Sequence, residues 1–146
     1  MLTHDQLSEE WKTDCKIDST KLLERMYRHP ILHSKYLTIL QDYKVQNRKL
    51  TLKYQKNRLI KTRYFNGELT KEELDQYSLK QYLFRKPLKA EMETLLDADS
   101  ELQLLQEQIL YIETLIQSTE LIMKEITNQH FLFKNLIEQT KFLAGA

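Results

Sequence analysis

The carboxyl-terminal third of the chain carries an apolar pattern that an α-helix presents on one side. Apolar residues recur in alternating steps of three and four over residues 102–140, and no glycine or proline lies between Pro87 and Gly145. Such steps place side chains on one face of a helix, and their mean of 3.5 is the heptad spacing of coiled coils. The sequence therefore predicts one long helix, whose apolar stripe is interrupted by the polar residues Thr119, His130 and Thr140.

A helix of this length has too few partners within 146 residues to cover its apolar stripe. We therefore predict that residues 90–146 form an acidic and apolar helical region for homo-oligomerisation. The alternative is a bundle within one chain, because long helices with this spacing also build bundles. The residues expected at the oligomer interface are Leu105, Ile109, Ile112, Ile116, Met123, Ile126, Phe133 and Ile137.

A second long helix is predicted for residues 31–64, which contain no glycine or proline. Residues spaced by four and three form one helical face there. These are Tyr36, Leu40, Tyr43, Asn47, Leu50 and Tyr54. Asp18 or Ser19 is expected to cap a shorter helix before it. That shorter helix should end at His29-Pro30, because the residue before a proline avoids the helical conformation.

Two capping boxes predict short helices elsewhere. Thr3 and Gln6 mark the start of one that runs through Trp11, and Thr70 and Glu73 mark another. We expect the second helix to continue through Tyr77 and Tyr82. The dipeptides Asn66-Gly67 and Lys86-Pro87 are expected in turns.

The scarcity of turn-forming residues supports the same fold class. Only two glycines and two prolines occur, which is too few for a fold built from many β-hairpins. Glutamate, lysine, glutamine and leucine, which favour helices, are abundant. We therefore predict a mainly α protein with long helices.

The formal net charge of +1 hides an uneven distribution along the chain. Residues 21–63 hold twelve Lys or Arg and two Asp or Glu, whereas residues 90–146 hold three and ten. Such asymmetry points to binding partners rather than to a fold. We assign residues 1–89 as a basic region that meets phosphates or an acidic protein.

The sequence offers no pattern of an enzyme, a metal site or a cofactor site. It has no glycine-rich phosphate loop and no nucleophile elbow. Cys15 is the only cysteine, and no histidine is evident as its base. His29 and His33 are spaced for a metal, but Pro30 lies between them and no carboxylate stands at a matching step.

Several features favour a cytoplasmic protein with no membrane segment. No run of 18 or more apolar residues occurs, and the polar, acidic beginning of the chain does not have the pattern of a secretory signal. A lone cysteine cannot form an internal disulfide, which fits a reducing compartment.

The basic segment 44–63 is the feature with the clearest functional meaning. It holds eight Lys or Arg and no acid, and aromatic residues lie within and beside it. Cations in a row suit a phosphate backbone, and aromatic rings suit the unstacked bases of single strands. The candidate residues for DNA binding are Lys49, Lys53, Lys56, Arg58, Lys61 and Arg63, with Tyr64 and Phe65 as possible stacking rings.

Three alternatives remain open at this point. The basic helix can dock an acidic protein, so that the chain is a non-enzymatic oligomeric adaptor. It can bind double-stranded DNA as a basic helix does. A nuclease is disfavoured, because residues 43–67 contain no carboxylate.

Five segments resemble the UvsY family, the recombination mediators of T-even-like bacteriophages, in the same order along the chain. They are residues 7–22 (LSEEWKTDCKIDSTKL), 33–37 (HSKYL), 59–67 (LIKTRYFNG), 89–99 (KAEMETLLDAD) and 131–145 (FLFKNLIEQTKFLAG). The segments span nearly the whole chain, and none of them is a catalytic signature.

The resemblance implies a function that spacing alone does not give. UvsY-like proteins are not enzymes and form rings of six or seven subunits through the C-terminal helix. They bind single-stranded DNA in the host cytoplasm and weaken the hold of the phage single-strand-binding protein. They then help the UvsX-like recombinase to load in recombination, repair and recombination-dependent replication. The family's Lys-x-Arg pair that contacts DNA corresponds to Lys61 and Arg63.

Overall fold

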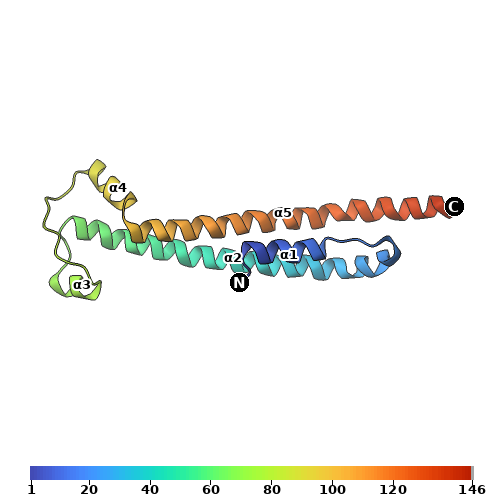
Figure 1. Ribbon diagram of the computed structural model, residues 1–146, viewed down its shortest axis with the longest axis horizontal. Helices are drawn as coiled ribbons and strands as arrows, with labels where there is room; N and C mark the ends of the chain where they lie inside the picture. The colour runs from blue at the N-terminus through green and yellow to red at the C-terminus, as the bar shows by residue number, and fades with distance from the viewer. Residues whose placement is uncertain (146) are drawn as a thin grey trace. The chain divides into compact units, whose positions relative to one another are not determined.

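The computed structural model describes residues 1–145, all of whose regular structure is helical (Figure 1). The elements are α1 (His4–Asp14), a 3₁₀ turn (Ser19–Lys21), α2 (Leu22–Phe65), α3 (Lys71–Gln76), α4 (Lys89–Asp97) and α5 (Ser100–Leu143). The predicted mainly α fold with long helices is confirmed. Residue 146, the last of the predicted oligomerisation region, lies outside the described residues.

The helices form two compact units. The first unit contains residues 1–46 and the part of α5 from Ile112 onward, and the second unit contains residues 47–111. Each unit includes parts of both functional regions, 1–89 and 90–146, that charge distinguishes. The division of the chain into a DNA-binding region 1–89 and an oligomerisation region 90–146 therefore stays a prediction.

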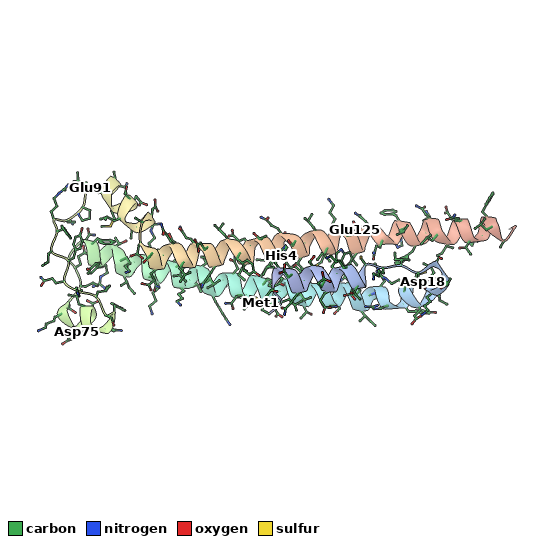
Figure 2. The ribbon with its side chains drawn as sticks, viewed as in Figure 1. Met1, His4, Asp18, Asp75, Glu91 and Glu125 are labelled. Atoms are coloured by element: carbon green, nitrogen blue, oxygen red, sulfur yellow. The ribbon has the colours of Figure 1, made fainter. Side chains whose placement is uncertain are left out.

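The structure contains the capping residues that the sequence predicts ahead of α1 and α2. Thr3 and Gln6 form both hydrogen bonds of a capping box at α1, which runs three residues beyond Trp11. The Asp18 carboxylate accepts a hydrogen bond from the Thr20 N–H at 2.9 Å and opens the 3₁₀ turn that leads into α2. Figure 2 marks Asp18 at this bend of the chain.

Pro30 does not end a helix, contrary to the prediction from the sequence. It lies inside α2, in its ninth position. A proline there removes one hydrogen bond to the carbonyl four residues earlier. Pro30 itself is exposed on the surface of α2. Buried contacts on either side, made by Arg25 and Leu32, hold the helix together across the proline.

The core of the first unit lies where α1 and α5 pack on α2. The rings of Trp11 and Tyr36 meet edge to face, with centroids 5.5 Å apart. Buried apolar side chains from all three helices form this core. They are Leu7, Leu32, Tyr36, Leu40, Tyr43, Ile112, Leu115, Ile122, Ile126 and Phe133.

A buried carboxylate joins α1 to α2 within the first unit. Asp14 is only 4 % exposed and accepts hydrogen bonds from Arg28 at 2.7 Å, from Lys35 at 2.6 Å and from the Tyr36 hydroxyl at 3.0 Å. Burial raises the pKa of Asp14, but the hydrogen bonds from Lys35 and Tyr36 and the two positive charges outweigh burial. The net result is a lowered pKa.

The residues predicted for an oligomer interface have two kinds of surroundings. Leu105, Ile112, Ile126 and Phe133 are buried within the chain, and Ile109, Ile116, Met123 and Ile137 are half-buried. Further apolar side chains of α5 are exposed, namely Leu104, Leu110, Tyr111, Leu121, Phe131, Leu132, Phe142 and Leu143. The oligomer interface therefore stays a prediction.

The buried face of α5 shifts along the helix. Thr119 is fully buried and donates its hydroxyl to the Leu115 carbonyl at 2.7 Å. Further on, Gln129 is buried and His130, which lies on the heptad stripe, is exposed. The reason is that an α-helix has 3.6 residues per turn, so a strict heptad stripe drifts around a straight helix.

In the second unit, α2 ends at the predicted turn. Gly67 has a φ of +69°, and the N–H of Glu68 donates to the Arg63 carbonyl at 2.9 Å. A left-handed residue with this hydrogen bond is a Schellman cap, for which glycine is favoured. The turn at Asn66-Gly67 is therefore confirmed.

The helix that begins after Thr70 is shorter than predicted. Its capping box is present, but α3 ends at Gln76 and does not reach Tyr82. Ser78 adopts a φ of +56°, and the N–H of Leu79 donates to the Leu74 carbonyl at 2.9 Å. This second Schellman-type cap reverses the chain, and Tyr82 instead packs against the end of α2.

Candidate nucleic-acid interface

Helical periodicity places three lysines of α2 on one side of the second unit. Lys49, Lys53 and Lys56 are spaced by four and three, and all are exposed. Among the described residues, no carboxylate forms an ion pair with any of them. We call these three residues the lysine row.

Arg63 continues the direction of the lysine row, seven residues after Lys56. Its guanidinium donates two hydrogen bonds to the Glu73 carboxylate of α3, at 2.8 and 3.1 Å. These bonds and the opposite charges raise the pKa of Arg63 and lower the pKa of Glu73. A phosphate that binds Arg63 must therefore displace the Glu73 carboxylate or share the guanidinium with it.

Arg58 and Lys61 lie on other sides of α2 than the lysine row. Lys61 follows Tyr54 by seven residues and so shares its inward face, and the Tyr54 hydroxyl accepts a hydrogen bond from Gln106 of α5 at 3.0 Å. The Lys61 ammonium lies 3.2 Å from Asp99 and 3.6 Å from Glu101, and its side chain is only 14 % exposed.

Arg58 is also paired, with Glu93 of α4 at 2.8 Å. The structure therefore separates the six predicted cations into two sets. The lysine row is exposed and has no ion pair among the described residues, whereas Arg58, Lys61 and Arg63 each hold a carboxylate.

Tyr64 and Phe65 belong to an aromatic cluster at the end of α2. Their ring centroids are 5.4 Å apart, and Tyr82 contacts Tyr64 at 5.5 Å and Phe65 at 5.4 Å. Phe84 extends the cluster through Tyr82, again at 5.5 Å. Phe84 is exposed, whereas the other three rings are half-buried.

The segment that follows α3 is a part of this surface that reasoning from the sequence missed. Residues 79–89 hold four Lys or Arg, two aromatic residues and no acid, which is the kind of composition that singled out the basic segment 44–63. Leu83 and Phe84 are exposed there, by 83 % and 78 %. This basic and aromatic composition is visible in the sequence, but the prediction of a helix through Tyr82 drew attention away from it as a binding surface.

The described residues contain neither a metal-binding cluster nor a membrane-spanning helix. No group of three or more His, Cys, Asp or Glu side chains within residues 1–145 is placed to hold a metal ion. No helix among them is both long enough and apolar enough to cross a bilayer. What the second unit does offer is exposed cations beside aromatic rings, which suits a flexible polyanion with unstacked bases.

Comparisons with known proteins give one family. Residues 10–146 match the family model described as "Recombination, repair and ssDNA binding protein UvsY". The recombination protein uvsY of Enterobacteria phage T4 is 28 % identical over 143 residues, which is 97 % of either chain.

Solved structures agree in fold. A crystal structure of the bacteriophage T4 recombination mediator protein UvsY in lattice type II superposes with a TM-score of 0.85 and 23 % identity, and covers 99 % of both chains. The lattice type IV structure gives a TM-score of 0.81 at 22 % identity over 97 % of this chain and 98 % of that one. A match to the family model over residues 10–146 spans nearly the entire sequence, and the chain therefore belongs to the UvsY family.

Proposed function

We propose that the chain is a recombination mediator that binds single-stranded DNA. The observation that carries the proposal is the lysine row, three exposed cations on one side of α2 that no described carboxylate neutralises. Each such cation that contacts a phosphate releases counterions, which makes the binding favourable and dependent on salt. Family membership supports the same function.

The lysine row makes the first phosphate contacts in this proposal, and Arg58, Lys61 and Arg63 act second. Each of the latter three exchanges a carboxylate for a phosphate when DNA arrives. Phosphates and carboxylates are alternative partners of the same cations. Tyr64 and Phe65 supply rings on which bases stack.

Homo-oligomerisation through the C-terminal half, as a ring of six or seven subunits, is part of the proposal. Exposed apolar side chains of α5 such as Leu121 and Phe131 support it, because they remain uncovered in the single chain. A ring repeats the lysine row in every subunit, and linked sites gain avidity without new contacts.

The proposed action takes place in the host cytoplasm and needs no catalytic step and no cofactor. A strand held along several subunits is harder for a phage single-strand-binding protein to retain. The same strand is then presented to a UvsX-like recombinase. Binding and displacement are sufficient for this role, which makes the protein a mediator rather than an enzyme.

The test is the affinity for single-stranded DNA across a salt series. A variant with Lys49→Gln, Lys53→Gln and Lys56→Gln should bind more weakly and flatten the slope of log K against log salt. Three lost phosphate contacts lower the slope by roughly 2, at about 0.7 for each contact on a single strand. The matched control replaces three exposed lysines of α5, Lys124, Lys134 and Lys141, by Gln.

Equal slopes in the two triple variants would remove the lysine row from the site. Absence of DNA binding by the wild type at low salt would instead favour an adaptor whose basic helix docks an acidic protein. Among the described residues, the basic segment 44–63 forms five ion pairs, with Glu120, Glu93, Asp99, Glu101 and Glu73, and these support that alternative. A competition experiment between single-stranded and duplex DNA distinguishes a protein that prefers single strands from one that binds duplexes.

A further inference from the structure

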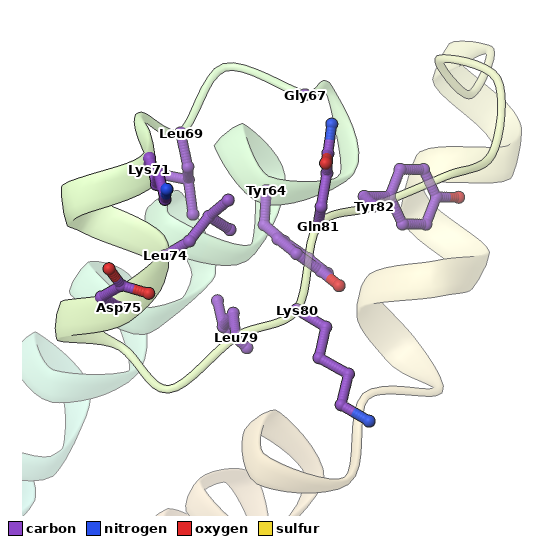
Figure 3. A pocket seen from close by; sticks show the side chains of 10 residues that line it. All are labelled: Tyr64, Gly67, Leu69, Lys71, Leu74, Asp75, Leu79, Lys80, Gln81 and Tyr82. Atoms are coloured by element: carbon purple, nitrogen blue, oxygen red, sulfur yellow. The ribbon is translucent and has the colours of Figure 1, made fainter.

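The second unit contains a cavity of about 750 Å³ between the end of α2, α3 and the segment after α3. The residues that line it are Tyr64, Gly67, Leu69, Lys71, Leu74, Asp75, Leu79, Lys80, Gln81 and Tyr82 (Figure 3). We call it the α3 cavity. Its volume lies within the range of about 300–1,000 Å³ that is usual for small-molecule sites.

The α3 cavity has an apolar side and a polar side. Leu69, Leu74 and Leu79 form the apolar side, and the Tyr64 side chain runs between these leucines and the segment that carries Gln81 and Tyr82 (Figure 3). Tyr64 is held in place by edge contact with Tyr82, at a centroid distance of 5.5 Å. A fixed aromatic ring beside aliphatic side chains suits a flat, weakly polar ligand.

The polar groups of the cavity suit a nucleotide. Lys71 and Lys80 are exposed and form no ion pair with the described carboxylates. Figure 3 shows them on opposite sides of the cavity, one on α3 and one on the following segment. The Gln81 amide can both donate and accept hydrogen bonds, and the Asp75 carboxylate can accept them.

We propose that the α3 cavity binds an unstacked base of single-stranded DNA, with Tyr64 as the ring on which the base stacks and Lys71 and Lys80 as contacts to the flanking phosphates. This inference rests on the proposed function and adds a base-binding site to it. The cavity also lies in line with the lysine row, because Tyr64 follows Lys53 by eleven residues, about three turns of α2.

The arrangement explains how this surface distinguishes single strands from duplexes. A row of lysines attracts any nucleic acid, because it contacts only phosphates. A base that is paired and stacked in a duplex cannot enter a cavity, whereas a base of a single strand is free to do so. The α3 cavity therefore adds the preference for single strands that the lysine row lacks.

The experiment compares two oligonucleotides of equal length and charge, one an oligothymidylate and one made of abasic sites. The wild type should bind the oligothymidylate more tightly, by roughly 5- to 150-fold for one stacked base. Equal affinity for both would overturn the cavity proposal and the stacking on Tyr64 and Phe65, and would leave the phosphate contacts of the proposed function intact. Binding of neither would overturn both.

Tyr64→Leu should remove the advantage of the oligothymidylate and leave the affinity for the abasic strand unchanged. The matched control is Tyr77→Leu, since Tyr77 is a half-buried tyrosine of the same unit that does not line the cavity. It should keep the advantage. An equal loss of affinity for both strands in Tyr64→Leu would mean that Tyr64 only supports the fold, and the proposal would be wrong.

A second pair of variants keeps the test decisive if Tyr64→Leu does not fold. Lys71→Gln with Lys80→Gln should weaken binding of both strands more than Lys124→Gln with Lys134→Gln. The control lysines are exposed on α5, do not line the cavity and lie outside the basic segments 44–63 and 79–89. Equal effects of the two double variants would overturn the assignment of Lys71 and Lys80 to the flanking phosphates.

Discussion

Glu73 has two roles at the level of single residues. Its carboxylate accepts the Thr70 N–H at the start of α3 and also holds Arg63. Glu73→Gln should keep the capping box, because glutamine also serves there, and should release Arg63 from its negative partner. We expect tighter binding of single-stranded DNA, with a salt slope steeper by about 0.7 for one added phosphate contact.

The matched control for Glu73 is Glu72→Gln. Glu72 is exposed on the same helix, so this change removes the same charge without touching Arg63. If both variants bind DNA alike in a salt titration, the gain in affinity comes from the change in net charge. The ion pair with Glu73 then does not keep Arg63 from binding DNA.

Asp14 illustrates how one buried charge affects stability. Asp14→Asn should lower the free energy of unfolding by about 3 kcal/mol, the lower end of the range for a broken buried pair, since Arg28 is half exposed. Chemical denaturation followed by circular dichroism measures this difference.

The pH dependence of that difference has a definite sign. The pKa of Asp14 is lower in the folded chain than in the unfolded chain. The stabilisation by its carboxylate is therefore complete above the unfolded pKa of about 4, and it is lost as the pH falls through the folded pKa. The gap between wild type and Asp14→Asn should therefore be full at neutral pH and shrink below about pH 4. A gap that stays constant into acid would contradict the assigned network.

At the level of elements, Pro30 is the exposed weak point of α2. Pro30→Ala restores a backbone hydrogen bond and should raise the free energy of unfolding by about 1–3 kcal/mol. Thermal unfolding followed by circular dichroism gives the measurement. Pro87→Ala, outside the helices, is the control and should change stability little. A destabilised Pro30→Ala would mean that α2 is adapted to the proline.

The elements also show what the sequence can predict. Helix starts with a capping box and the turn at Asn66-Gly67 were predictable, because neighbouring residues determine them. The continuation of α2 through Pro30 was not, since the hydrogen bond from Arg25 to the distant Gln129 and the burial of Leu32 compensate for the local cost.

The candidate site was predictable only in part, for the same reason. Composition singled out the cations of residues 44–63, but not which of them are paired. The partners Asp99, Glu93 and Glu73 lie 10 to 38 residues away in the sequence, and only the fold brings them to Lys61, Arg58 and Arg63. The α3 cavity was missed because the sequence suggested a longer helix there.

At the scale of the whole molecule, assembly can be separated from folding. Leu121 is 68 % exposed, so Leu121→Glu should leave the helix content unchanged. If the exposed face of α5 forms the oligomer, this variant should reduce the mass measured by light scattering toward the 17.6 kDa of one chain. Binding of single-stranded DNA should weaken with it, because avidity is lost.

Two further variants make the mass measurement specific. Gln117→Glu adds the same charge at an exposed polar position and should leave the mass unchanged. Ile112→Glu places a charge where the side chain is only 3 % exposed and should unfold the first unit. A wild type that is already a single chain in solution would end the proposal of a ring.

The pairing of Trp11 with Tyr36 gives the protein a built-in optical reporter. Trp11 is the sole tryptophan of the chain and belongs to the first unit, whereas the lysine row and the α3 cavity belong to the second. Selective excitation of the indole therefore reports on the first unit alone. A change in its emission when DNA is added would record a signal transmitted through α2, α5 or neighbouring subunits rather than a base stacked on the ring, and it would do so without any attached dye.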